Sequence, residues 1–499
     1  MARGWAFLLP LIVVAGPSAA QQPLSAIDWL RDLPPTVTVP TMPDGADLPE
    51  VTVEPLAPQL EPAGLVGGNI TGLADTLWQG SDPDRLARRI NDVPVSALPA
   101  ARRLLFTLLL TEAQRLSSAA DPVLEARARR LMAMGAADPA FALLEGSQPL
   151  DDRGLIAVWF DAGLLVGDPS GPCRVISETP HLAPGYAASI YCAARTGQIA
   201  SATVMFDGAR SLGLMSAEEE ELLDRLLHPE FFEDADMMPP SDAPTPLTAT
   251  LRTAIGEPLS TSALPRAFAM IDLRDIAGWK AQLEAAERLG RAGALTGNAL
   301  LGVYTARMPA ASGGVWDRVA ALQRFETALF TGSSDAVAKT LPAAWEVMND
   351  AGLSVAFADV FAPDLERMRL PEPVAETALH FLLLSDRYET AAMQVDVTSL
   401  APQTAYLVAL AQGDPARVPF SDPLHSAITD GFASMPALPD RLNADSLGET
   451  ILLVLGHLDS GARGNLGDLT DALLGLRALG LEDVARRAAL QLLILGVEG

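Results

Sequence analysis

The chain has 499 residues, of which 49% are hydrophobic and 5% aromatic, and its 35 basic and 62 acidic side chains give a formal net charge of −27. This acidity argues against nucleic acid or anionic lipid as a partner, because both are bound through a basic surface that displaces counterions. We interpret the charge as a means of staying soluble. The length predicts two or three domains.

The first twenty residues have the pattern of a cleavable export signal. Arg3 precedes an apolar run over residues 5–14, and small residues follow at Ser18 and Ala20. A signal peptidase accepts such small residues, so we expect cleavage between Ala20 and Gln21. An uncleaved anchor is the alternative, but a run of about ten residues is shorter than the roughly twenty that cross a bilayer. We therefore expect a periplasmic or secreted protein with no integral membrane span in the mature chain.

Proline dominates the segment after the signal. Eight of the residues in 33–62 are Pro, which fixes φ and removes a backbone donor, so regular helix is excluded there. We assign residues 21–70 to an extended or disordered Pro-rich linker. A second group of prolines lies in residues 229–265. We interpret it as a joint between helical domains at 71–228 and 266–499, and the alternative is a long loop inside one continuous superhelix.

After residue 71, apolar side chains recur at helical spacing. Ser81 to Asp84 open a helix with Pro83 near its first position. Ser216 and Glu219 have the spacing of a capping box before a helix that runs to Leu227. Further helices are predicted over residues 98–116, 122–134, 155–166 and 183–195.

Glycine followed by Leu predicts several helix ends, because a left-handed glycine with an apolar residue after it closes a helix. The glycines in this context are Gly163, Gly213, Gly352 and Gly480. Helices of about 10–18 residues with short loops and almost no alternating pattern predict an all-α protein.

Two short segments resemble tetratricopeptide repeats. In the first, the residues at the family's second-helix positions are Gly197, Ile199, Ala202, Phe206 and Ala209. In the second, residues 386–391, Tyr388 and Ala391 are in place, but Asp386 stands where Gly is usual. First-helix positions depart from the family at Ser189, Ile190 and Ala193. The resemblance covers about a tenth of the chain and implies stacked helical hairpins, an α-solenoid or superhelix whose concave face often binds peptides.

The two cysteines are Cys173 and Cys192. In an exported chain, a single pair of cysteines nineteen positions apart predicts a disulfide. Two buried thiols are the main alternative, and a redox or metal role is a further one. The Cys-x-x-Cys redox motif does not occur.

No motif for catalysis, a metal or a cofactor is present, so we predict no catalytic, metal-binding or cofactor-binding residue. The histidines are far apart in sequence and show no His-Glu-x-x-His spacing: His181, His228, His380, His425 and His457. The densest carboxylates are those of residues 218–221 with Asp224, and those of Glu233, Asp234 and Asp236. We interpret both groups as structural, because the first complements a helix N-terminus and the second adjoins the Pro-rich joint.

Two classes of function follow from these observations. The first is a non-enzymatic, helical-repeat interaction or scaffold protein of the bacterial cell envelope that binds a protein or peptide. The second is an envelope glycan-acting enzyme whose helical scaffold carries a catalytic Glu or Asp without a recognisable motif. The absence of motifs favours the first class, and the sequence leaves the oligomeric state open.

Overall fold

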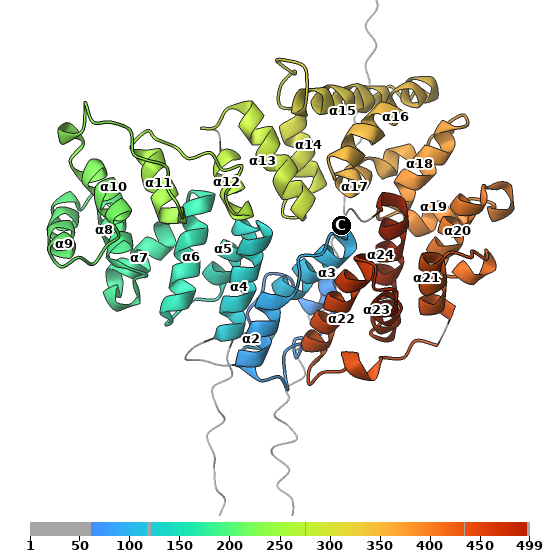
Figure 1. Cartoon of the computed structure of the whole chain (residues 1–499), viewed down its shortest axis with the longest axis horizontal. Coiled ribbons are helices and arrows are strands. Elements are labelled where there is room, and N and C mark those ends of the chain that lie inside the picture. Colours follow the sequence, from blue (N-terminus) through green and yellow to red (C-terminus); the bar gives the residue numbers. More distant parts are fainter. Residues whose placement is uncertain (1–60, 117–120, 149, 275, 434, 497–499) are drawn as a thin grey trace, which may run out of the picture. The chain divides into compact units, whose positions relative to one another are not determined.

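A computed structural model describes residues 61–116, 121–148, 150–274, 276–433 and 435–496 (Figure 1). Within these residues the protein is built from α-helices and short 3-10 turns, and it contains no β-strand, which confirms the all-α prediction. The described residues form one compact unit. The predicted cleavage site at Ala20 and Gln21, and most of the predicted linker, lie outside the described residues.

The first twelve helices are α1 (Gly68–Thr71), α2 (Pro83–Asp92), α3 (Pro99–Leu110), α4 (Pro122–Met134), α5 (Ala137–Gly146), α6 (Arg153–Val166), α7 (Ser170–Glu178), α8 (Tyr186–Arg195), α9 (Ile199–Ser211), α10 (Ala217–Leu227), α11 (Pro246–Ala254) and α12 (Ala269–Asp272). The later ones are α13 (Trp279–Ala292), α14 (Gly297–Thr305), α15 (Val315–Phe330), α16 (Ser334–Asp350), α17 (Ser354–Leu365), α18 (Val374–Leu383), α19 (Tyr388–Met393), α20 (Pro402–Ala411), α21 (Pro423–Ala433), α22 (Leu447–Ala462), α23 (Leu466–Ala478) and α24 (Glu482–Leu495). Among the described residues, no helix is long and apolar enough to cross a membrane.

Helix starts follow the capping chemistry of the sequence. The Asp82 side chain accepts a hydrogen bond from the Arg85 N–H at 2.8 Å, with Pro83 at the first position of α2. Ser216 and Glu219 form the predicted capping box at α10. In each case a side-chain oxygen satisfies a backbone N–H that has no partner inside the helix.

Two helix ends differ from the prediction. The helix predicted over 98–116 ends at Leu110, because the chain after it pairs with residues 61–66, which belong to the predicted linker. Ala63 and Ala113 exchange backbone hydrogen bonds of 2.9 and 3.1 Å. Gly163 does not end α6. Its missing Cβ instead makes room for the backbone of the next loop, since a Cβ there would lie 3.0 Å from the Asp168 oxygen. Gly213, Gly352 and Gly480 have the positive φ that was predicted for them.

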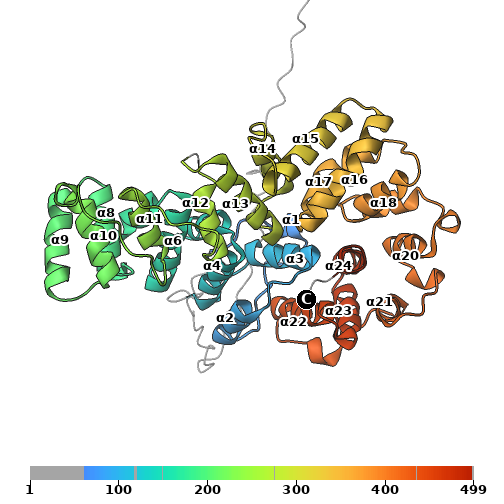
Figure 2. The same cartoon turned by 45° about the horizontal axis from the view of Figure 1, so that its top comes forward.

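Helices close in sequence pack as neighbours, and the ends of the described chain also meet. Helices α2 and α3 lie against α22 and α24 (Figures 1 and 2). The Gly448 N–H donates to the Leu77 carbonyl at 2.9 Å, and a Cβ on Gly448 would lie 2.3 Å from the Trp78 ring. Only glycine therefore allows this contact between segments some 370 positions apart.

Buried side chains fall into two main cores. The larger one combines residues between Ala63 and Leu251 with residues between Leu379 and Leu492. The second lies within residues 279–384 and contains the ring contacts of Phe325, Phe357 and Phe381. In residues 229–265, α11 packs on α6 and α10. The division into helical domains at 71–228 and 266–499 stays a prediction.

The predicted disulfide is confirmed. Cys173 of α7 is bonded to Cys192 of α8, with their Cα atoms 5.0 Å apart, and both side chains are buried. The bond joins two helices that pack against each other. The bond therefore crosslinks the α7–α8 hairpin, and α9 packs against α8 of this hairpin.

Removing this bond is expected to destabilise the protein. In the Cys173→Ala/Cys192→Ala double variant we expect the free energy of unfolding to fall by about 3 kcal/mol, because the unfolded chain gains loop entropy. Denaturant unfolding would measure this loss. Wild-type protein unfolded and refolded under reducing conditions is the control and should show a similar loss. A difference below about 1 kcal/mol would contradict the stabilising role.

Candidate functional site

A cavity of about 430 Å³ lies where α3, the start of α14, α17 and α24 come together. Apolar side chains and charged groups share its walls. The apolar ones are Phe106, Leu295, Val355 and Val360, and the charged ones are Arg102, Arg103, Asp359, Asp386 and Arg487. An apolar cavity with a few convergent polar groups is the usual form of a small-molecule site.

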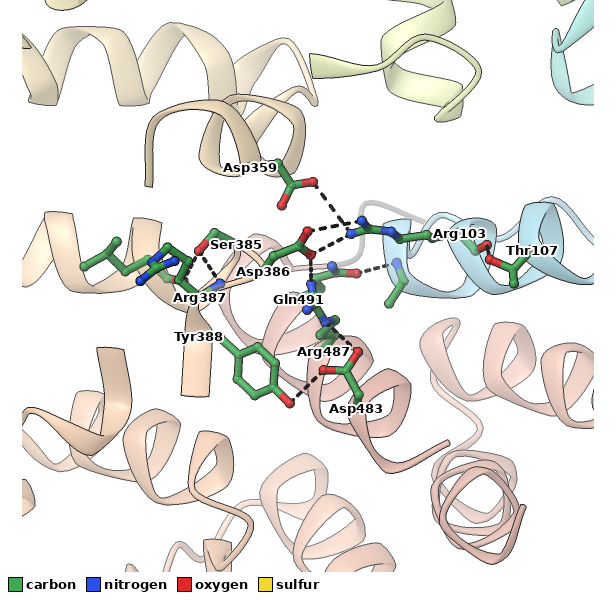
Figure 3. A network of polar contacts seen from close by, with 12 residues as sticks. Arg103, Thr107, Asp359, Ser385, Asp386, Arg387, Tyr388, Asp483, Arg487 and Gln491 are labelled. Atoms are coloured by element: carbon green, nitrogen blue, oxygen red, sulfur yellow. Dashed lines mark hydrogen bonds and ion pairs between the residues drawn. The ribbon is translucent and has the colours of Figure 1, made fainter. Parts of the chain in front are cut away.

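An ion-pair network spans one side of this cavity (Figure 3). Both carboxylate oxygens of Asp386 accept from the Arg103 guanidinium, at 2.7 and 3.2 Å, and Asp386 also pairs with Arg487. Arg487 donates in turn to Asp483 at 2.9 Å, and the Tyr388 hydroxyl donates to Asp483 at 3.0 Å. Burial alone would raise the pKa of Asp386, but the two arginines outweigh it and the pKa is lowered. Asp386 is therefore a fixed anion.

Asp359 of α17 faces the same guanidinium but is poorly compensated (Figure 3). Its Oδ2 lies 3.9 Å from Nη1 of Arg103, which is too long for a hydrogen bond. Its Oδ1 is buried with no hydrogen-bond partner among the described residues. Removal from water, together with the nearby charge of Asp386, raises the pKa of Asp359 to about 6. Asp359 thus keeps unused capacity to accept hydrogen bonds at the cavity wall.

Glycine allows the cavity walls to approach closely. Gly297, the first residue of α14, lies against α17, where a Cβ would be 2.5 Å from the Ala356 oxygen. Thr296 caps α14 by accepting from the Ala299 N–H at 3.3 Å. These residues fix the start of α14 opposite Asp359 and Val360 at the cavity.

A second cavity, of about 570 Å³, lies beside α8 and α9. Ile176, Ala183, Tyr186, Ala193 and Met205 give it an apolar wall, and Arg153, His181 and Gln198 add polar groups. Helix α9 packs against α8 and α10 (Figures 1 and 2). Its opposite side is exposed.

The exposed residues of α9 are mostly apolar or small, and its two charged residues, Asp207 and Arg210, are also exposed. We call Ala200, Val204 and Gly208 of α9, together with Leu212 directly after the helix, the α9 face; these residues recur every four positions. Val204 and Leu212 are each 73% exposed, and Ile199 at the start of the helix is 50% exposed. Contiguous apolar groups in water are typical of contact surfaces for other molecules.

No known protein family, curated protein or solved structure matches this chain. The two cavities and the α9 face are therefore interpreted from their own chemistry.

Of the two carboxylate groups singled out in the sequence, the one around Glu218 and Asp224 has structural partners. Glu218 accepts two hydrogen bonds from Arg252, at 3.0 and 2.9 Å, and one from Ser241 at 2.7 Å. Asp224 accepts from Arg210 and contacts His228. Glu233, Asp234 and Asp236 are exposed. No group of His, Cys, Asp and Glu suited to a metal ion occurs in the part of the chain that the structure describes.

The network around Arg103 was not predicted from the sequence, because its members are far apart in the chain. Arg103 and Asp386 are separated by 283 positions, and Asp386 and Arg487 by 101. One signal was present: Asp386 departs from the glycine usual in the repeat-like turn. This departure places a carboxylate between Arg103 and Arg487.

Proposed function

We propose that this protein is a non-enzymatic, helical-repeat interaction protein of the bacterial cell envelope that binds a segment of another envelope protein through the α9 face. The observation that carries the proposal is the exposure of Val204 on α9 and of Leu212 directly after this helix. The α9 face also adjoins the apolar wall of the second cavity, to which Tyr186 and Met205 contribute. A peptide with apolar side chains fits both surfaces.

The resemblance to tetratricopeptide repeats supports the same proposal. Ala202, Phe206 and Ala209 are buried, as the repeat pattern requires for the inner side of its second helix, while Ile199 is exposed. The confirmed disulfide suits an oxidising compartment, and export through residues 1–20 is part of the proposal. Stacked hairpins would present α9 to a partner on a rigid support.

Site-specific photocrosslinking in the native envelope tests this function. A crosslinking residue at Val204 is expected to capture one discrete protein, whereas the same residue at Phe330, which is 94% exposed on α15, is expected not to capture it. With the purified partner, Val204→Glu is expected to weaken binding by about tenfold or more, because a charge replaces an apolar contact. Equal capture from both positions, or unchanged binding by the variant, would contradict the proposal.

A glycan-acting enzyme is the second candidate, and one observation favours it. Asp359 has a raised pKa while Asp386 beside it has a lowered one, and environments that separate two carboxyl groups in this way are found in acid catalysts. Against it, Asp386 is held by two arginines and has no freedom to act as base or nucleophile. Turnover of envelope glycan by purified protein, lost in Asp359→Asn, would favour the enzyme over the interaction protein.

A further inference from the structure

We propose that the cavity between α3, α14, α17 and α24 binds a small zwitterion, a free α-amino acid with an apolar side chain, whose ammonium group pairs with Asp359 and whose carboxylate pairs with Arg103. This ligand site goes beyond the proposed function and does not depend on it. The α9 face is a separate surface.

The charges at the cavity wall match those of an amino acid. Asp359 and Arg103 lie 3.9 Å apart without a hydrogen bond between them, so each retains capacity for a ligand. Arg103 has five N–H donors and gives two hydrogen bonds to Asp386, and its side chain is more than half exposed. An α-amino acid carries its ammonium and carboxylate on neighbouring atoms. If its ammonium group faces Asp359 and its carboxylate faces Arg103, it would form an ion pair with each of them.

The apolar walls of the cavity indicate what side chain the ligand carries. Phe106, Leu295, Val355 and Val360 supply an apolar lining of the same cavity. Its volume of about 430 Å³ suits a small molecule and excludes a folded partner. Asp359 lines the cavity and accepts no side-chain hydrogen bond from the described residues, so its carboxylate favours a ligand with a hydrogen-bond donor, which an ammonium group provides and a plain carboxylic acid anion does not. An amino acid with an aliphatic side chain therefore fits better than a simple anion.

Proton linkage gives this site a characteristic signature. Without ligand, burial and the charge of Asp386 raise the pKa of Asp359 to about 6, although the charges of Arg103 and Arg487 and the backbone N–H of Asp386 oppose this rise. An adjacent ammonium favours the ionised carboxylate and lowers that pKa. Binding at pH 6 is therefore expected to release a fraction of a proton, and binding at about pH 8 is expected to release none.

The experiment uses the full chain and three probes: leucine, 3-methylbutylamine, which lacks the carboxylate, and 4-methylpentanoate, which lacks the ammonium. We expect calorimetry to show the tightest binding for leucine, weaker binding for the amine and the weakest for the acid. Heats measured at pH 6 in two buffers of different ionisation enthalpy should reveal proton release for leucine. The variant Asp359→Asn is expected to lose about tenfold or more in affinity and all of the proton release.

Asp364→Asn is the matched control, because Asp364 is an exposed residue of the same helix and pairs with Arg367 outside the cavity. It is expected to bind leucine as the wild type does. The inference is overturned if leucine does not bind at millimolar concentration, if the acid binds as tightly as leucine, or if Asp359→Asn binds unchanged. Failure of the Val204 crosslinking would leave these results untouched, so the two proposals can fail separately.

Discussion

Replacing Arg127 by Met is expected to lower the free energy of unfolding by about 3–5 kcal/mol. Arg127 of α4 is 2% exposed, and its guanidinium donates to the carbonyl oxygens of Leu109 at 2.8 Å, Ala63 at 3.0 Å and Thr111 at 2.8 Å. Burial lowers its pKa to about 10, so it stays charged at neutral pH. Methionine fills much of the space but leaves buried carbonyl groups without donors.

Denaturant unfolding would measure this loss, and hydrogen exchange at the Ala63 N–H, which bonds to the Ala113 carbonyl, would show the local opening. Arg129→Met is the matched control, two positions along the same helix. Arg129 is half-exposed and pairs with Glu125, so its loss is expected to cost at most about 0.5 kcal/mol. A cost for Arg127→Met as small as that of the control would mean that the buried guanidinium does not hold residues 61–66 in place.

Replacing Glu449 by Ala is expected to cost a similar amount, about 3–5 kcal/mol. Glu449 of α22 is 1% exposed, accepts a hydrogen bond from the Ser81 hydroxyl at 2.7 Å, and pairs with Arg85 and Arg89 of α2 at 3.1 and 2.6 Å. The variant leaves the buried hydroxyl without this acceptor and both arginines without their shared partner. The contact between α2 and α22 should weaken first.

The effect of Glu449 depends on pH in a defined direction. Burial alone would raise the pKa of its carboxyl, but the hydrogen bonds from Ser81 and Arg85 and the charges of both arginines outweigh it, so the pKa is lowered. A lowered pKa in the folded state contributes stability that is fully present above the unfolded value of about 4.3. That contribution is lost as the pH falls through the folded pKa.

Thermal unfolding from neutral to acid pH would show both effects. The difference between wild type and Glu449→Ala is expected to be largest at neutral pH and to shrink below about pH 4. Asp445→Asn is the matched control, because Asp445 also pairs with Arg85 but is exposed, and its loss is expected to cost at most about 0.5 kcal/mol. A difference that stays constant down to acid pH would contradict the role of the ionised carboxylate.

Local features of the fold were predictable from the sequence. The bounds of α4 at Pro122 and Met134 agree with the prediction, and so do the capping box at Ser216 and the bond between Cys173 and Cys192. Each depends on residues within about twenty positions, where capping, helical spacing and loop length act directly. The end of α3 was predicted wrongly, because backbone pairing with residues 61–66 competes with the helix.

The sequence by itself determined the helical class of the described chain, many helix starts and the cysteine pair, because these follow from short-range chemistry. Only the tertiary structure decided which carboxylates are buried and which lie at a cavity. Glu449 meets Arg85 across 364 positions, and Asp359 of α17 meets Arg103 of α3, which is also distant in sequence. Burial and the charges of residues distant in sequence set the pKa values of Glu449 and Asp359, and neither burial nor these charges can be read from the local sequence.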